Sequence, residues 1–135
     1  MSAKILIIED NEQNMYLLTF LLNQHGHEVV QAGDGKQGID LAERENPDLI
    51  LLDIQLPEMD GYAVTRKIKT IRALSGIPIV AVTSYAMMGD REKAMAAGCS
   101  GYIEKPINPE TFTEQIREFL PGTPQGKKVI SCTDV

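Results

Sequence analysis

Short runs of apolar residues alternate along this chain with stretches in which apolar residues recur every three or four positions. A continuous apolar run is typical of a buried strand, whereas the wider spacing predicts an amphipathic helix. Three strong runs and two weaker ones therefore predict five strands, at Ile5–Ile8, Leu49–Leu52, Ile77–Val82, Val29–Val30 and Tyr102–Ile103. Helices are predicted between and after them around Met15, Leu18 and Leu22, around Ile39, Leu41 and Ala42, around Val64, Ile68 and Ile71, and around Phe112, Ile116 and Phe119.

Residues that favour helix ends fall where this alternation needs them. Gly26 and Gly98 stand at expected helix C-termini, and Asn108–Pro109 supplies an N-cap followed by proline at the first helical position. Strand and helix thus alternate five times, which favours an α/β fold with a parallel sheet and helices on both of its faces. We expect the three strong runs in the centre of the sheet and the two weaker runs at its edges.

Length and composition are those of one ordinary domain. The chain has 135 residues, of which 43% are hydrophobic, so it can bury a core without disulfides. After Leu120, the proline and glycine residues of Pro121–Gly126 end the helical pattern. We therefore expect a domain over residues 1–120 and a disordered C-terminal tail over residues 121–135. Cys99 and Cys132 have no paired spacing, and we interpret both as free thiols in a reducing cytoplasm, with Cys99 in the core.

The charge pattern narrows the class of partner. A formal net charge of -6 argues against nucleic acid, which requires clustered Lys and Arg side chains. The apolar run near Met1 is too short to span a bilayer and does not resemble a signal peptide. We expect a cytoplasmic protein with no membrane or nucleic-acid partner. We interpret His25 and His27, which flank Gly26, as exposed residues rather than ligands.

Chemically reactive side chains follow the predicted strands. They are Glu9–Asp10 after the first, Asp53 after the third, Thr83–Ser84 after the fourth and Glu104–Lys105–Pro106 after the fifth. In open α/β sheets, ligands bind beyond the carboxyl ends of the strands, near the point where strand order reverses. Two carboxylates about 4 Å apart repel by about 4 kcal/mol at an effective dielectric constant near 20, so three require compensation.

Lys105 can neutralise only one of these three carboxylates, and a hard divalent cation such as Mg²⁺ would balance the rest. Phosphoryl transfer needs a metal, a cation and a hydroxyl donor around an in-line nucleophile. Asp53 could be that nucleophile, with Lys105 as the cation and Thr83 as the hydroxyl donor. A carboxylate that attacks phosphorus yields an acyl phosphate.

At these residues the chain resembles the receiver domains of two-component response regulators, from about Lys4 to Leu120. The stretch at residues 85–90 (YAMMGD) is further similar to single-domain, stand-alone receivers, including cell-cycle regulators, and to receivers of hybrid histidine kinases. The resemblance implies a flavodoxin-like, doubly wound sheet with strand order 2-1-3-4-5 and five helices. It rests on four signatures in order: Glu9–Asp10, residues 48–61 (DLILLDIQLPEMDG), Thr83–Ser84 and Lys105–Pro106.

The resemblance also implies the roles of the acidic residues. Asp53 is the residue phosphorylated. Glu9, Asp10 and Asp53 hold Mg²⁺, which Mn²⁺ could replace, and the backbone carbonyl of Gln55 adds a ligand. The donor is a histidine kinase or a histidine phosphotransfer protein. The signal passes to a downstream protein, so the chain is a phosphoacceptor switch that catalyses only its own phosphorylation and dephosphorylation. The sequence does not decide between a relay and an allosteric output.

Further residues respond to the phosphate in this family. The resemblance implies that Lys105 pairs with Asp53 and then with its phosphate, and that the hydroxyl of Thr83, next to Ser84, turns toward it. Tyr102 then rotates inward, and the peptide bond before Pro106 is cis. Two positions that border the phosphate, Gln55 and Tyr85, vary in the family and tune the lifetime of the phosphate.

The fourth predicted helix is the element that we expect to move. Its inner positions include Ala86, Ala94 and Ala97 rather than large aliphatic residues, so little burial holds it in one place. The nearby Met87, Met88 and Met95 are interpreted as residues that fill gaps in or near this helix.

Structural interpretations of the same residues also exist. Asp10 and Asn11 could only cap the first helix, and Asp53 could only start a turn ahead of Pro57. Thr83 alone would be an ordinary strand residue, and Tyr102 could be half-buried packing. The convergence of four strand ends favours the chemical interpretation.

Other functions fit the sequence less well. A phosphohydrolase of the haloacid dehalogenase type needs an acid two residues after its aspartyl nucleophile, where this chain has Gln55. A nucleotide-binding enzyme would have a glycine-rich loop after the first strand, where residues 10–13 are DNEQ. A receiver that never carries phosphate would have lost site residues, and all of them are present.

Overall fold

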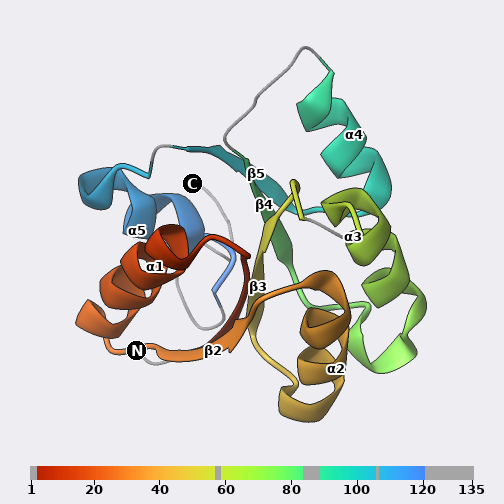
Figure 1. Cartoon of the computed structure of the whole chain (residues 1–135), viewed down its shortest axis with the longest axis horizontal. Helices are drawn as coiled ribbons and strands as arrows, with labels where there is room; N and C mark the ends of the chain where they lie inside the picture. The colour runs from red at the N-terminus through yellow and green to blue at the C-terminus, as the bar shows by residue number, and fades with distance from the viewer. Residues whose placement is uncertain (1–2, 57–58, 84–88, 106, 121–135) are drawn as a thin grey trace, which may run out of the picture.

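A computed structural model describes residues 3–56, 59–83, 89–105 and 107–120 of the chain. Five parallel strands form one sheet in the order β2-β1-β3-β4-β5 (Figure 1). This order confirms the predicted fold, with the two weaker runs at the edges. The strands are β1 (Lys4–Ile8), β2 (Glu28–Ala32), β3 (Leu49–Asp53), β4 (Ile79–Thr83) and β5 (Gly101–Glu104).

The helices lie in two layers around this sheet. Figure 1 shows α1 and α5 on one face of the sheet and α2, α3 and α4 on the other. No helix among the described residues is long and apolar enough to cross a membrane. The helices are α1 (Glu12–Gln24), α2 (Gly35–Glu45), α3 (Gly61–Thr70), α4 (Asp90–Ala97) and α5 (Pro109–Arg117), with a short 3₁₀ helix η1 (Arg72–Leu74) after α3.

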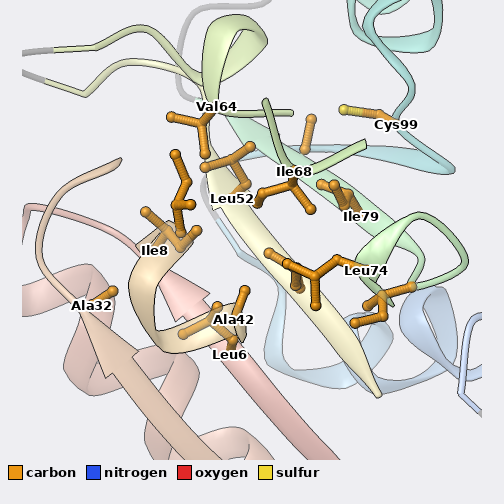
Figure 2. Close-up of a cluster of buried hydrophobic side chains, with 14 of the residues drawn as sticks. Leu6, Ile8, Ala32, Ala42, Leu52, Val64, Ile68, Leu74, Ile79 and Cys99 are labelled. Atoms are coloured by element: carbon orange, nitrogen blue, oxygen red, sulfur yellow. The ribbon is translucent and has the colours of Figure 1, made fainter. Parts of the chain in front are cut away.

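Two hydrophobic clusters fill the spaces between sheet and helices. Successive residues of a strand point to opposite faces, so Ile5 and Ile7 belong to the cluster under α1 and α5. Leu6 and Ile8 face the other helical layer. Figure 2 shows that second cluster, where side chains of β1, β3 and β4 meet those of α2, α3 and η1. Because both faces are covered, every residue of β3 and β4 is buried. Cys99 lies at one end of the second cluster, as predicted for a small core residue.

Short polar side chains begin the helices near the strand ends. Asn11 caps α1, because its side chain accepts a hydrogen bond from the backbone N–H of Asn14 at 2.9 Å. Asn108 caps α5, with proline at the first helical position as predicted. Gly98 is the C-cap of α4 at a φ of 117°, a left-handed conformation that favours glycine. Gly26 also has a positive φ, one residue after the C-cap of α1.

Several details differ from the sequence predictions. Ile71, predicted on the third helix, lies just after the end of α3, and Met95, interpreted as a gap-filling residue, is exposed. The strand predicted from Ile77 begins only at Ile79, although the carbonyl of Pro78 still accepts a hydrogen bond from the Ile50 N–H. Phe119, predicted on the last helix, lies after the end of α5 and packs over Gly101. His27 is half-buried rather than exposed, and its Nδ1 accepts a hydrogen bond from the Ala3 N–H at 3.1 Å.

Candidate functional site

Three carboxylates meet at the carboxyl ends of two neighbouring strands. Glu9 and Asp10 directly follow β1, and Asp53 is the last residue of β3. Carboxylate oxygens of all three lie within 4.8 Å of one another. β1 and β3 are also the strands between which the strand order reverses, so this is the position where open α/β sheets bind ligands.

Backbone hydrogen bonds fix the carboxylates in place. The Glu9 N–H bonds to the Ala32 carbonyl at 3.0 Å, which holds the end of β1 against β2. The Gln55 N–H donates to Asp53 Oδ1 at 3.0 Å, and the Asn11 N–H donates to Glu9 Oε2 at 3.2 Å. Glu9 and Asp53 are only 3% and 5% exposed, while Asp10 is exposed. The site therefore has two buried carboxylates and one that faces solvent.

Lys105 supplies the positive charge from the loop after β5. Its Nζ lies 2.8 Å from Glu9 Oε1 and 3.5 Å from Asp53 Oδ2, and its side chain is 8% exposed. The Lys105 N–H also donates to the carbonyl of Thr83 at 2.7 Å, which anchors the loop to β4. The lysine thus contacts both buried acids and lies nearer to Glu9 than to Asp53.

The electrostatics of the site favour an additional cation. Burial raises the pKa of Glu9 to about 7, and the neighbouring Asp53 acts in the same direction, while Lys105 opposes both. Ionising all three acids therefore requires more positive charge than Lys105 provides. Carboxylate oxygens, one of them open to water, are the donor set that Mg²⁺ prefers. The residues present fit a magnesium ion.

The remaining described site residues lie on β4, on β5 and after β3. Thr83 ends β4, is buried, and pairs with Glu104 of β5. Tyr102 lies on β5 with its hydroxyl oxygen buried and without a hydrogen-bond partner among the described residues. Gln55 is exposed just beyond Asp53. The structure thus gathers Glu9, Asp10, Asp53 and Lys105.

Several predicted residues lie outside the described part of the chain. Ser84, Tyr85 and Pro106 are among them, together with Ala86, Met87, Met88 and the tail over residues 121–135. Their predicted roles stay predictions.

Two features of this region did not emerge from the sequence. Tyr62 at the start of α3 donates a hydrogen bond to Asp90 at the start of α4, and the ring of Tyr102 lies under the guanidinium of Arg91. A tyrosine in one helix and an aspartate in another carry no spacing that links them. Only the packing of α3 against α4 brings them together.

The fold and the site together define a doubly wound α/β domain. Its acidic site is of a type that binds cations, and it lies where the strand order of the sheet reverses. A family model described as the response regulator receiver domain matches residues 5–117, and the chain belongs to that family. This finding confirms the resemblance seen in the sequence, and with it membership of two-component signalling.

Individual relatives agree with this assignment. The polar-differentiation response regulator DivK of Brucella ovis is 44% identical over 120 residues, which cover 89% of this chain and 98% of DivK. Among solved structures, the chemotaxis protein CheY4 of Vibrio cholerae matches with a TM-score of 0.84 at 26% identity, over 89% of this chain and 100% of CheY4.

A third relative was solved with a metal ion. It is the receiver domain of the sensor histidine kinase PA1611 from Pseudomonas aeruginosa PAO1, which has a magnesium ion coordinated in its active site cleft. It matches with a TM-score of 0.76 at 35% identity, over 87% of this chain and 99% of that receiver.

Proposed function

We propose that this receiver domain accepts a phosphoryl group on Asp53, in a reaction that requires Mg²⁺, and signals through protein contacts that depend on the phosphate. The observation that carries the proposal is the buried Asp53 carboxylate, which lies within 4.8 Å of two further acids and 3.5 Å from Lys105 Nζ. Membership of the receiver family and the magnesium ion in the PA1611 receiver support it.

The chemistry follows from the positions of these groups. An oxygen of Asp53 attacks phosphorus of a phosphohistidine, a P–O bond forms, the P–N bond breaks, and the imidazole leaves with a proton. Glu9, Asp10, Asp53 and the carbonyl of Gln55 would hold Mg²⁺. When bound, the ion neutralises charge on the phosphoryl oxygens. The Gln55 N–H, which bonds to Asp53 Oδ1, orients the attacking carboxylate.

Lys105 and Thr83 act on the product. Lys105 Nζ contacts Glu9 more closely than Asp53, so we propose that it moves from Glu9 to a phosphoryl oxygen when the phosphate forms. Thr83 at the end of β4 donates its hydroxyl to the same group, next to Ser84, and Tyr102 on β5 responds to that movement. Gln55, two residues after Asp53, and Tyr85, two after Thr83, border the phosphate and control its lifetime.

The partners follow from membership of the receiver family. The donor is a histidine kinase or a histidine phosphotransfer protein of the cytoplasm, the kind of protein from which receivers take their phosphoryl group. The recipient of the signal is another protein. The chain itself is a switch rather than an enzyme with a separate substrate.

Intact-protein mass spectrometry tests the proposal. The wild-type chain is incubated with acetyl phosphate and Mg²⁺, beside Asp53→Asn and a control variant, Asp40→Asn, which alters an exposed acid on α2. We expect one phosphoryl adduct on the wild type and on Asp40→Asn, and none on Asp53→Asn. When EDTA is present during the incubation to bind the Mg²⁺, we expect no adduct on any of the three. An adduct on Asp53→Asn equal to that on the wild type, or no adduct on the wild type, would contradict the proposal.

A further inference from the structure

A hydrogen bond joins the starts of α3 and α4. The Tyr62 hydroxyl donates to Asp90 Oδ1 at 3.3 Å and lies 3.5 Å from the Asp90 carbonyl oxygen. Both distances are at the long end for a hydroxyl donor, so this bond is weak and readily exchanged. We call the four residues that meet here, Tyr62, Asp90, Arg91 and Tyr102, the tyrosine cluster.

Tyr102 on β5 lies beside Arg91, the residue that follows Asp90 in α4. Its ring lies with its centroid 5.9 Å from the Arg91 guanidinium carbon, and its hydroxyl oxygen is buried without a hydrogen-bond partner among the described residues. Burial, followed by the charge of Asp90, raises the pKa of Tyr102, and the same two causes raise that of Tyr62 to about 12. Both phenols therefore lie within the electrostatic reach of one aspartate. A buried hydroxyl without an acceptor is unfavourable, so Tyr102 has a reason to bind that carboxylate.

Only small side chains of α4 are buried among the described residues, and its first residue has no side-chain cap before it. Its N-cap is Gly89, which has no side chain to cap the helix, and the buried residues of α4 are Ala94 and Ala97. Side chains this small bury little apolar area, so the helix gains little from staying in one place. The Tyr62–Asp90 bond, although weak, links α3 to the beginning of α4.

The tyrosine cluster is connected to the phosphoacceptor site by short stretches of chain. Residues 84–89 join Thr83 at the end of β4 to Asp90. Tyr102 stands two residues before Glu104, which pairs with Thr83, and three before Lys105. A rearrangement of Thr83 and Lys105 around a phosphate therefore acts on both Asp90 and Tyr102.

We propose that Tyr62 is a positioning residue of the switch: its hydroxyl holds Asp90 in the unmodified protein, and phosphoryl acceptance at Asp53 transfers that carboxylate from the Tyr62 hydroxyl to the Tyr102 hydroxyl. This inference rests on the proposed function of Asp53. In this inference, the start of α4 is released when the Asp90 carboxylate exchanges the Tyr62 hydroxyl for the Tyr102 hydroxyl as its donor.

Removal of one hydroxyl group should bias this exchange. Tyr62→Phe keeps the ring and its packing but removes the hydroxyl that competes with Tyr102 for Asp90, so the arrangement that follows phosphorylation becomes more populated beforehand. A ligand selective for that arrangement then binds more tightly. For beryllofluoride, a phosphoryl analogue, we expect affinity in the presence of Mg²⁺ to rise about fivefold, as for the loss of one competing hydrogen bond.

The experiment compares four variants with the wild type by titration of beryllofluoride under NMR. They are Tyr62→Phe, Tyr102→Phe, the double variant, and Tyr16→Phe as a control that removes a hydroxyl from a 72% exposed tyrosine on α1. We expect the gain for Tyr62→Phe to disappear in the Tyr102→Phe background and to be absent in Tyr16→Phe. An unchanged affinity for Tyr62→Phe, or an equal gain in both backgrounds, would overturn the inference.

A second measurement needs no ligand and separates the two proposals. In protein labelled with ¹³C at tyrosine Cζ, Tyr62→Phe should move the Tyr102 resonance, because its hydroxyl gains an acceptor, whereas Tyr16→Phe should not. A Tyr102 resonance that stays in place overturns the exchange even if beryllofluoride binds. If the wild type binds no beryllofluoride, the phosphoacceptor proposal fails, and the role of Tyr62 toward Asp90 is still decided by the Tyr102 resonance.

Discussion

Gly61 lies directly behind Asp53, the proposed phosphoacceptor, where no other side chain fits. Its N–H donates to the Ile54 carbonyl at 2.8 Å, and an added Cβ would lie 2.5 Å from Ile54 Cα and 2.9 Å from the Asp53 carbonyl oxygen. Both are backbone atoms, which cannot rotate away as a flexible side chain can. The glycine thus sets how closely the start of α3 can approach the end of β3.

Gly61→Ala should therefore destabilise the fold by about 1–3 kcal/mol, the usual cost of overpacking a close contact. Gly76→Ala is the matched control, because a Cβ there has nothing within 4 Å and the φ of Gly76 is not positive. We expect the control to change stability by less than about 0.5 kcal/mol. Urea unfolding of both variants measures the difference, and equal midpoints would show that the backbone yields without cost.

For individual residues, the sequence predicts which side chains lie at the strand ends better than it predicts the contacts between helices. Glu9, Asp10 and Asp53 could be placed together because parallel strands bring their carboxyl ends to one edge of the sheet. The closer approach of Lys105 to Glu9 than to Asp53 could not be predicted, since it depends on distances of 2.8 and 3.5 Å within one crevice.

Element positions were predictable where hydrophobic pattern and end signals agreed. All five strands and five helices are found, because buried strands need continuous apolar runs and amphipathic helices need the wider spacing. The errors fall at ends, where pattern alone is ambiguous. Ile77 and Phe119 are apolar and at least partly buried, yet lie outside the strand and helix assigned to them. His27 was misjudged because its acceptor role depends on Ala3 in another segment.

The connection between α1 and β2 should make stability depend on pH. Burial, and then the charge of His25, lower the pKa of His27 from its ordinary value of 6.5, and its Nδ1 can accept the Ala3 hydrogen bond only while unprotonated. The unfolded chain therefore binds the proton more readily than the folded chain. The stabilisation is complete above about pH 6.5 and is lost as pH falls through that value toward the lower pKa of the folded state.

Unfolding by urea between about pH 5 and pH 7.5 checks this expectation. His27→Gln keeps an acceptor but does not titrate, so its stability should fall less steeply with acid than that of the wild type. His25→Gln, which alters an exposed neighbour, should retain most of the wild-type dependence. Parallel curves for wild type and His27→Gln would show that this histidine does not link folding to pH.

The whole molecule combines a sheet whose central strands are buried on both faces with a crevice whose charges are not balanced. Two covered faces stabilise the fold, as the buried strands β3 and β4 show. The three acids repel one another, and only Lys105 contacts them with positive charge among the described residues. A cation bound there should therefore stabilise the entire domain, since it binds only where the strand ends are assembled.

We expect Mg²⁺ to raise the free energy of unfolding of the wild-type chain by about 1.4 kcal/mol at tenfold excess over its Kd. Asp10→Asn, which removes the exposed carboxylate of the site, should lose most of this gain, and Asp40→Asn on α2 should keep it. Thermal or urea unfolding with and without the ion measures the effect. Equal gains for Asp10→Asn and Asp40→Asn would place the bound ion elsewhere.

The ion pair between Lys105 and Glu9 joins residues 96 positions apart in the chain. During synthesis on the ribosome, the acids after β1 and at the end of β3 emerge well before this lysine does. A nascent chain that has been synthesised only as far as β4 thus has the acidic residues but lacks the lysine that pairs with them. The proposed acceptance of a phosphoryl group should therefore become possible only when β5 and the following Lys105 have been added.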